Sequence, residues 1–310
     1  MNPASASSTA APECGFQGNS DIYGLGIRVG IYLQWLAAIV AELSGPDDIE
    51  VSHRAAGSYQ LAMLAGLVLV TQDHTPGVHA VEAFLILLFC FAGVWVASIR
   101  TARASGLSAM LSETRVEHPG STTRPPTPAT GFFRQLLGCA TCAYGIWTLF
   151  VGLDVLPRTA CDEVGFFFAR VRLFGWFRDM FKVFFIISLV ASSVLLVEQV
   201  VRRGTLLAVL MRDWPRLQIA SSPPLENNIP ASGLEAGRTV LLRQSLGGIV
   251  ALGLFVVAVE LTLSWNSVRG VYTCEDFGQL FPLVLSASNL VSVSARVAKA
   301  IMMRNVSVKL

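Results

Sequence analysis

Seven apolar stretches, most of them close to 20 residues long, are spread along this chain of 310 residues. A helix of about 20 apolar residues crosses the roughly 30 Å hydrocarbon layer of a bilayer. The pattern therefore predicts an all-α fold, a polytopic helical bundle that lies in a membrane. The expected spanning segments are 25–44, 57–72, 79–99, 133–156, 181–200, 245–265 and 278–300, of which 57–72 is the shortest.

The composition agrees with a membrane location. Hydrophobic residues make up 53% of the chain and charged residues 14%, whereas soluble domains carry about 25% charged residues. The net charge of +2 is too small to indicate a nucleic-acid partner. Residues 1–20 are polar and contain no Lys or Arg, so they lack the pattern of a cleavable signal peptide. The first spanning segment is therefore expected to direct insertion.

The chain is expected to form one membrane domain, at 21–304, between a polar tail at 1–20 and a short tail at 305–310. Within this domain, 112–130 and 213–237 are rich in Pro and polar residues. Such segments cannot bury enough apolar surface to offset the entropy lost on ordering, so we predict two disordered cytoplasmic loops. No internal repeat is visible, which leaves the inverted-repeat architecture of many transporters without support.

The distribution of Lys and Arg sets the expected orientation, because cytoplasmic loops carry an excess of both. With the N-terminus outside or luminal and the C-terminus cytoplasmic, sixteen basic residues fall on the inner side and six on the outer side. The outer six are Arg158, Arg170, Arg172, Arg178, Lys182 and Arg269. An internal membrane such as the endoplasmic reticulum is the expected location.

The segment 165–178 holds three of these arginines among Phe and Trp residues. One interpretation is a segment that lies at the membrane interface. The other is an extension of the fifth spanning helix whose arginines reach the headgroups. The sequence leaves both open.

Ionisable residues within or beside the apolar stretches are the main indication of function, because a charge in hydrocarbon is costly and is usually functional. In the predicted orientation the polar residues gather toward the outer leaflet. They are Asp21, Arg28, Glu82, Asp154, Glu260, Asp276 and Gln279. We expect them to line one cavity that opens on that side.

The first spanning segment carries the clearest pattern. Asp21, Arg28, Trp35 and Glu42 recur every seven residues, and Tyr32 follows Arg28 by four. On one helix these side chains share a face, which should turn away from lipid. Asp21 and Arg28 are expected to form an ion pair. That pair either fixes helix packing or belongs to the wall of a functional pocket.

Glu260 is a single carboxyl in an otherwise apolar run at 251–265. An isolated carboxyl in an apolar site is expected to be neutral, and it can then act as a general acid. The alternative is a polar contact that joins two helices. Glu82 admits the same two interpretations.

Three cysteines fall on the expected outer side, where thiols can oxidise. They are Cys14, Cys161 and Cys274, and we favour a Cys161–Cys274 disulfide. Cys139 and Cys142 match C-x-x-C but lie in a spanning segment, which favours core packing over metal binding or redox chemistry.

The sequence predicts neither a metal site nor a cofactor. Asp73, His74 and His79 are interpreted as part of a solvated loop rather than as metal ligands. The chain contains no Walker A loop, G-x-G-x-x-G motif or H-E-x-x-H motif. Their absence removes most ATP, dinucleotide and zinc-protease interpretations.

Three segments carry a resemblance to a known group of proteins. They are 14–35, 166–178 and 273–282. They resemble a large group of integral membrane proteins from filamentous fungi, which includes integral-membrane terpene cyclases of meroterpenoid pathways of the ascofuranone and macrophorin type. The resemblance covers most of the chain, but it carries no catalytic residue over. It implies an isomerase- or lyase-type enzyme of secondary metabolism that protonates a prenylated, epoxidised aromatic or quinone-like substrate, with membrane lipid as its surroundings.

Such a cyclisation needs an acid to start it and aromatic faces to stabilise positive charge. Glu260, Glu82 and Asp21 are the candidate acids, and Arg28 is expected to line the substrate pocket. The candidate cation stabilisers are Tyr32, Trp35, Trp147 and Trp265, although packing is the commoner role of membrane aromatics. The rival interpretations are a seven-span receptor or transporter, and a structural protein whose charges only fix packing.

Overall fold

The computed structural model describes residues 14–43, 46–72, 78–104, 128–217, 231–274 and 276–307. Among these residues, six helices are long and apolar enough to cross a membrane: Ser20–Ala41, Ile49–Gln72, Gly131–Val155, Trp176–Val201, Ser245–Trp265 and Phe277–Lys299. Ala80–Val94 is a shorter apolar helical segment. The predicted helical membrane bundle is confirmed to this extent. The predicted span 79–99 corresponds to the shorter segment Ala80–Val94 and is not among the six. At 57–72 the helix begins well before the predicted segment.

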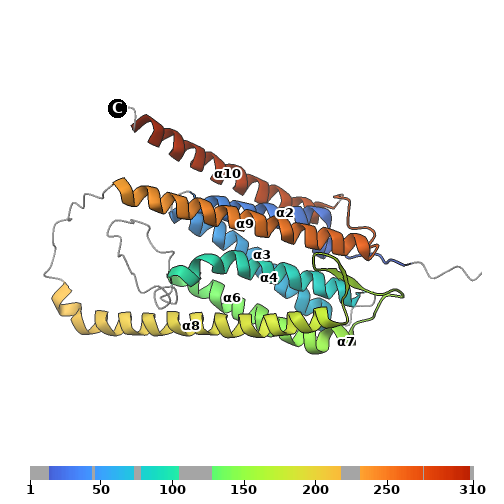
Figure 1. Ribbon diagram of the computed structural model, residues 1–310. Coiled ribbons are helices and arrows are strands. Elements are labelled where there is room, and N and C mark those ends of the chain that lie inside the picture. The colour runs from blue at the N-terminus through green and yellow to red at the C-terminus, as the bar shows by residue number, and fades with distance from the viewer. Residues whose placement is uncertain are drawn as a thin grey trace, which may run out of the picture.

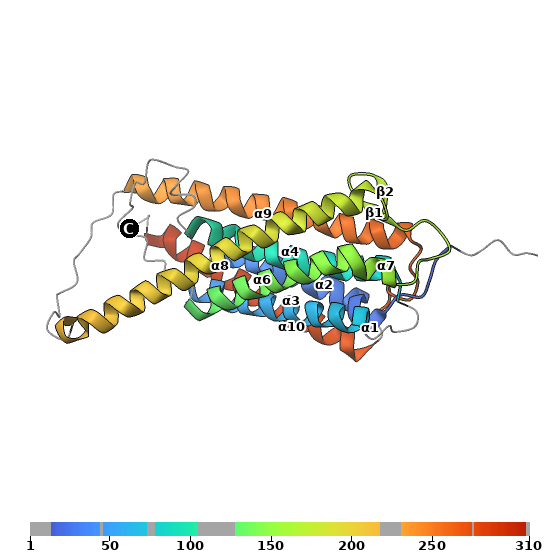
Figure 2. The ribbon, with the colours of Figure 1, turned by 90° about the horizontal axis from the view of Figure 1, so that it is seen from below.

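The long helices run side by side (Figures 1 and 2). In chain order the elements are α1 (Ser20–Tyr23), α2 (Leu25–Ala41), α3 (Pro46–Gln72), α4 (Ala80–Ala104), α6 (Pro128–Trp147), η1 (Thr148–Gly152), α7 (Leu153–Val155), β1 (Val164–Phe166), β2 (Arg170–Arg172), α8 (Trp176–Leu217), α9 (Ala231–Trp265) and α10 (Phe277–Ser307).

Helix α4 is the centre of the bundle. Every residue from Ala80 to Val94 is buried, and the helix contacts α2, α3, α6 and α9. A helix that is apolar around its whole circumference requires neighbours on all sides. Rings from other helices supply part of this packing, because Phe84 meets Phe177 at 5.6 Å and Phe89 meets Phe255 at 5.8 Å between ring centroids.

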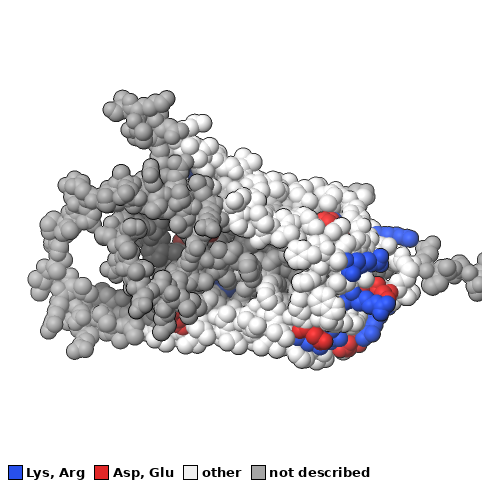
Figure 3. Space-filling view, in the orientation of Figure 1, with Lys and Arg blue, Asp and Glu red and all other residues white. Residues whose placement is uncertain are grey.

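The segments 14–19, 156–175 and 266–274, together with Asp276, are called here the loop end and lie together at one end of the bundle, on the right in Figure 1. The N-terminal segment is held there by backbone hydrogen bonds. The Gly18 N–H donates to the Arg269 carbonyl at 2.9 Å, and the Arg269 N–H donates to the Phe16 carbonyl at 2.9 Å. In Figure 3, a cluster of described Lys, Arg, Asp and Glu side chains lies at the same end, beside a surface of described uncharged residues.

A disulfide closes the loop end, but it is not the predicted one. Cys14 bonds Cys161, and Cys274 is a free thiol. The predicted pair Cys161–Cys274 is wrong because the Cys274 sulfur is packed against α2, where it would lie 2.7 Å from a Cβ placed on Gly26. The pairing of segment 14–19 with the Arg269 backbone leaves Cys14 to reach Cys161 instead.

The aromatic and arginine-rich segment 165–178 is a β-hairpin followed by a helix start, not a continuous extension of the fifth spanning helix. β1 pairs with β2 in antiparallel register, with Gly165 opposite Val171. Helix α8 begins only at Trp176. The side chain of Asn266 extends the hairpin edge, because it accepts the Val164 N–H at 3.0 Å and donates to the Val164 carbonyl at 2.7 Å.

The two predicted disordered loops are only partly described. Residues 128–130 belong to α6, 213–217 to α8 and 231–237 to α9, so these parts are helical. The remainder of both loops lies outside the described residues. Helix α8 has 42 residues, or about 63 Å at 1.5 Å per residue. It is therefore about twice as long as a bilayer core is thick.

Helices α2 and α10 pack closely against each other. Gly26 and Gly30 of α2 face the backbone of α10, and a Cβ on Gly26 would lie 2.5 Å from the Gln279 carbonyl oxygen. Small residues four apart permit this approach in membrane helices. Asn289 of α10 donates to Gln34 of α2 at 3.1 Å. Polar side chains also join both helices to α3, because Gln34 donates to the Ser52 carbonyl at 3.0 Å and Tyr59 donates to the Pro282 carbonyl at 2.8 Å.

Glu163 leads to a prediction about pH. The side chain is buried in the loop end, where its Oε1 accepts the Thr159 N–H at 2.9 Å. Burial raises the pKa of this carboxyl above its ordinary value. As the pH rises, the unfolded chain loses the proton first, so this contribution to stability is present below the unfolded pKa and is lost as the pH rises through the folded pKa. Glu163→Gln is expected to reduce the fall in stability between pH 4 and pH 7.

The measurement is thermal unfolding in detergent across that pH range. Asp162→Asn changes the neighbouring carboxyl, whose side chain is 68% exposed, and is expected to keep the wild-type pH profile. A Glu163→Gln profile that parallels the wild type would show that Glu163 does not carry the effect.

Candidate functional site

An ion pair between α2 and α9 lies within the spanning helices. Arg28 Nε donates to Glu260 Oε1 at 2.9 Å, and its second terminal nitrogen lies 3.3 Å from Oε2. The remaining nitrogen donates to the carbonyls of Tyr23 at 2.8 Å and Val271 at 3.1 Å. The guanidinium therefore has a partner on every side. Its planar, fork-shaped set of donors suits this arrangement, which a lysine would not reproduce.

The two partners differ in access. The Arg28 side chain is 0% exposed, whereas the Glu260 side chain is 36% exposed. The Tyr32 hydroxyl donates to Glu260 Oε1 at 3.1 Å, and the Arg28 guanidinium carbon lies 5.4 Å from the centre of the Tyr272 ring. Glu260 is thus a carboxylate fixed from one side by Arg28 and Tyr32 and open on another.

The prediction that Glu260 is an isolated carboxyl is therefore wrong, because Arg28 and Tyr32 both contact it. The apolar run around it hides its partner, because Arg28 belongs to another helix 232 residues earlier. An ion-paired carboxylate is an acceptor of hydrogen bonds and protons.

Tyr23 connects this pair to Glu82. Its carbonyl accepts from Arg28, and its hydroxyl donates to Glu82 Oε1. Glu82 Oε2 also accepts the His79 N–H at 2.8 Å, which is the contact of a capping box at the start of α4. Glu82 is 1% exposed. Its three donors, which include the Asn19 N–H at 3.3 Å, fix this carboxyl between the N-terminal segment and the start of α4.

Asp21 does not pair with Arg28. Its side chain is exposed, and its N–H donates to the Asn19 side chain at the cap of α1. The predicted pair is wrong because the helix is interrupted: α1 ends at Tyr23, and Gly24 takes an extended conformation (φ −57°, ψ 164°) before α2 begins. The seven-residue spacing therefore does not place Asp21 and Arg28 on one face.

The four predicted cation stabilisers are not together. Tyr32 and Trp35 lie on the α2 face that turns toward α4 and α9, where Trp35 meets Phe255 at 5.1 Å and Phe89 at 6.3 Å between centroids. Trp265 stacks on Phe166 of the hairpin. Trp147 is part of the outer surface of α6, beside Tyr144. Only Tyr32 among them contacts Glu260.

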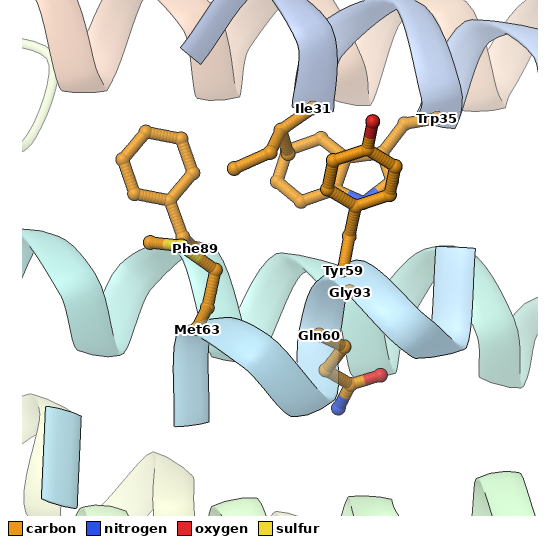
Figure 4. Close-up of a pocket in the computed structure, with 7 residues that line it drawn as sticks. All are labelled: Ile31, Trp35, Tyr59, Gln60, Met63, Phe89 and Gly93. Atoms are coloured by element: carbon orange, nitrogen blue, oxygen red, sulfur yellow. The ribbon is translucent and has the colours of Figure 1, made fainter. Parts of the chain in front are cut away.

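A pocket lies near these rings, between α2, α3 and α4 (Figure 4). Its lining residues are Ile31, Trp35, Tyr59, Gln60, Met63, Phe89 and Gly93. The space has no room for a water-sized sphere. It is a packing gap of the core and does not hold a substrate in this conformation.

Asp154 belongs to a separate cluster. Arg178 of α8 donates to both of its carboxyl oxygens, at 2.8 and 2.6 Å, and also to the carbonyls of Leu149 and Phe150. Those carbonyls lie in η1, a π-helical turn, where the altered spacing frees backbone acceptors. The guanidinium satisfies them, so this cluster fixes α8 against the end of η1 and does not line the Glu260 site.

The other predicted polar residues lie apart from Glu260. Gln279 is buried, and its Oε1 accepts the Gly26 N–H at 3.3 Å, which fixes α10 against α2. Asp276 is exposed in the loop end. His79 stacks on Phe16 at 4.3 Å, whereas Asp73 and His74 lie outside the described residues.

Sequence reasoning missed two tyrosines of the site. Tyr23 links Arg28 to Glu82 through its carbonyl and hydroxyl, and Tyr272 places its ring over Arg28. The position of Tyr23 between two predicted polar residues was a usable signal. Tyr272 has no comparable signal, because its approach depends on how the 266–276 loop folds over α2.

Neither a family model, nor a curated protein, nor a solved structure shows a significant match to this chain. The interpretation of the site therefore depends on its own geometry. That geometry is a carboxylate in a spanning helix, held by a buried guanidinium and a phenol and partly open to its surroundings. It can stabilise positive charge or accept a proton.

Proposed function

We propose that the chain crosses the membrane seven times, with α4 as the seventh span and with the loop end on the luminal or outer side. The Cys14–Cys161 disulfide supports this orientation, because disulfides persist in oxidising compartments. The excess of basic residues on the opposite side supports it independently. An odd number of spans then places the C-terminus in the cytoplasm. An endomembrane such as the endoplasmic reticulum provides both environments.

We further propose that the protein is an integral-membrane terpene cyclase acting on a prenylated, epoxidised aromatic or quinone-like substrate. The observation that carries the proposal is the partly exposed Glu260 side chain, which Arg28 and Tyr32 hold within the spanning helices. A substrate dissolved in the bilayer reaches such a group without crossing water. The resemblance of segments 14–35, 166–178 and 273–282 to membrane cyclases of meroterpenoid pathways supports the same class.

In this mechanism an acid protonates the epoxide oxygen, and the C–O bond breaks as an alkene attacks the carbon and forms the ring bond. The final cation loses a proton and becomes an alkene, so the reaction is a net isomerisation. Glu260 stabilises the cation and takes the last proton, because it is a carboxylate at the start. Tyr32 and Trp35 offer aromatic faces to positive charge. Arg28 positions Glu260. Glu82 is the proposed donor of the first proton, because Tyr23 connects it to Arg28, and the exposed Asp21 is the alternative acid.

Glu260→Gln is expected to lower cyclised product by at least about 100-fold, the usual contribution of a positioned acid or base. The measurement is product analysis by mass spectrometry from a host that expresses the full chain and is fed prenylated phenol epoxides. Glu163→Gln is the matched control, because it makes the same glutamate-to-glutamine change at a buried position of the loop end and leaves the site intact. It is expected to retain wild-type product.

Unchanged product from Glu260→Gln would remove that residue from the mechanism. Wild-type protein that binds the epoxide in membranes but yields no cyclised product would contradict the cyclase proposal and favour the receptor or transporter. Separate Glu82→Gln and Asp21→Asn variants then identify the first proton donor, because only the donor's loss abolishes ring opening.

A further inference from the structure

The β-hairpin at the loop end carries aromatic side chains that have few partners in the described part of the chain. Phe168, at its tip, is 76% exposed, and Phe167 and Trp176 are 40% and 57% exposed. Arg170 and Arg172 follow on β2, and both are exposed. Phe166, Phe167, Phe168, Arg170, Arg172 and Trp176 are called here the hairpin rim.

The hairpin rim lies at the depth where two spanning helices end. Phe166 stacks on Trp265, the last residue of the span in α9, with centroids 6.0 Å apart. Phe167 meets Trp176, the first residue of the span in α8, edge to face at 5.4 Å. Aromatic residues concentrate at this boundary between hydrocarbon and water. The rim is therefore continuous with the apolar surface of both helices.

The hairpin is held rigidly in this position. Asn266 makes two hydrogen bonds with the backbone of Val164, and the Leu173 N–H donates to the Glu163 carbonyl at 2.8 Å. Arg170 lies 3.5 Å from the Trp265 carbonyl. The rim is thus a fixed projection rather than a loose loop.

The backbone of Phe168 is unusual for so large a side chain. Its φ is +55°, in the left-handed region that favours glycine or asparagine. Among the described residues, its ring contacts are those to Phe166 and Phe167. Glycine or asparagine would adopt this backbone conformation at lower cost. A large exposed ring in a strained position is explained when something outside the protein covers it.

We propose that the hairpin rim binds the phospholipids of the outer leaflet. Phe167 and Phe168 enter the leaflet just below the phosphates, and Arg170 and Arg172 bind the phosphate oxygens, which guanidinium groups engage through paired hydrogen bonds. Arg172 also lies 3.1 Å from Asp162, but its side chain is 76% exposed, which leaves donors for a lipid. The rim thereby fixes the depth of α8 and α9 in the bilayer. This inference does not depend on the cyclase proposal.

The test uses the full chain in lipid nanodiscs. Phe168→Trp adds an indole at the tip, and its fluorescence is obtained by subtracting the wild-type signal. With lipids brominated near the headgroup end of the acyl chains, we expect strong quenching and a blue-shifted emission. Ala160→Trp, on an exposed residue of the same loop end, is the control and is expected to show neither. Equal quenching at the two positions would overturn the proposal.

Two further variants test the arginines and the Phe168 ring separately. Phe168→Trp in an Arg170→Gln, Arg172→Gln background is expected to be quenched less, because the phosphate contacts are lost, and undiminished quenching would contradict the role of the arginines. Phe168→Gly is expected to fold at least as well as the wild type, since glycine adopts the same φ freely. If Phe168→Trp is not quenched and Phe168→Gly converts an oligomer into a monomer, the rim binds a second copy and not lipid.

Discussion

Arg28→Ala is expected to lower the free energy of unfolding by about 3–5 kcal/mol, the usual cost of removing one partner of a buried ion pair. The change leaves Glu260 without its cation and leaves the Tyr23 and Val271 carbonyls without their donor. Because Glu260 is partly exposed, its uncompensated charge costs less, and we expect the loss of stability toward the lower part of that range. The measurement is equilibrium unfolding in mixed micelles, with size-exclusion elution as a check on the folded state.

Two comparisons isolate the ion pair. Arg158→Ala removes an arginine from an exposed pair with Asp154 and is expected to cost less than about 1 kcal/mol. Arg28→Met combined with Glu260→Leu replaces both charges by apolar groups and is expected to recover much of the loss. An Arg28→Ala variant as stable as Arg158→Ala would show that the buried pair contributes little to the fold.

Glu260→Gln is expected to affect activity much more than stability. Glu260→Gln retains an oxygen that accepts from Arg28 or Tyr32, so the fold loses less than in Arg28→Ala. The same change removes the carboxylate charge and the proton acceptor, so the proposed reaction loses its final step. A variant that stays folded but makes no product therefore identifies chemistry rather than packing.

The location of the spanning helices was predictable because a bilayer imposes both length and hydropathy on each crossing. The segment 57–72 was predicted too short for a physical reason. The first half of α3 contains Ser52 and His53, whose polar side chains lower the hydropathy although both residues are buried against other helices. Hydropathy reports composition and does not detect burial inside the bundle.

The participants of the site were largely predictable, but their pairing was not. Arg28, Glu260, Tyr32 and Glu82 all belong to one connected network. The predicted pairing of Asp21 with Arg28 assumed one unbroken helix, but Gly24 interrupts it. Contacts between distant segments, such as Arg28 with Glu260, depend on the packing of α2 against α9, and no local pattern encodes it. The same reason explains the error in the disulfide.

Gly26→Ala and Gly30→Ala are each expected to destabilise the protein by about 1–3 kcal/mol, the usual cost of overpacking a tight contact. A Cβ on Gly26 would lie 2.5 Å from the Gln279 carbonyl oxygen, and one on Gly30 would lie 2.9 Å from the Pro282 carbonyl. Both obstacles are backbone atoms, so no side-chain rotation relieves them and α10 must move away from α2. The movement also strains the hydrogen bond from Tyr59 to the Pro282 carbonyl.

Gly253→Ala in α9 is the matched control, because nothing lies within 4 Å of its added Cβ. It is expected to be neutral or stabilising by up to about 1 kcal/mol, since alanine is the better helix former. Equilibrium unfolding of the three variants therefore distinguishes close helix contact from helix propensity: propensity alone would make all three more stable. A gain in stability for Gly26→Ala and Gly30→Ala would show that α2 and α10 do not meet backbone to backbone, and that the loop carrying Val271 and Tyr272 to Arg28 is not placed by this contact.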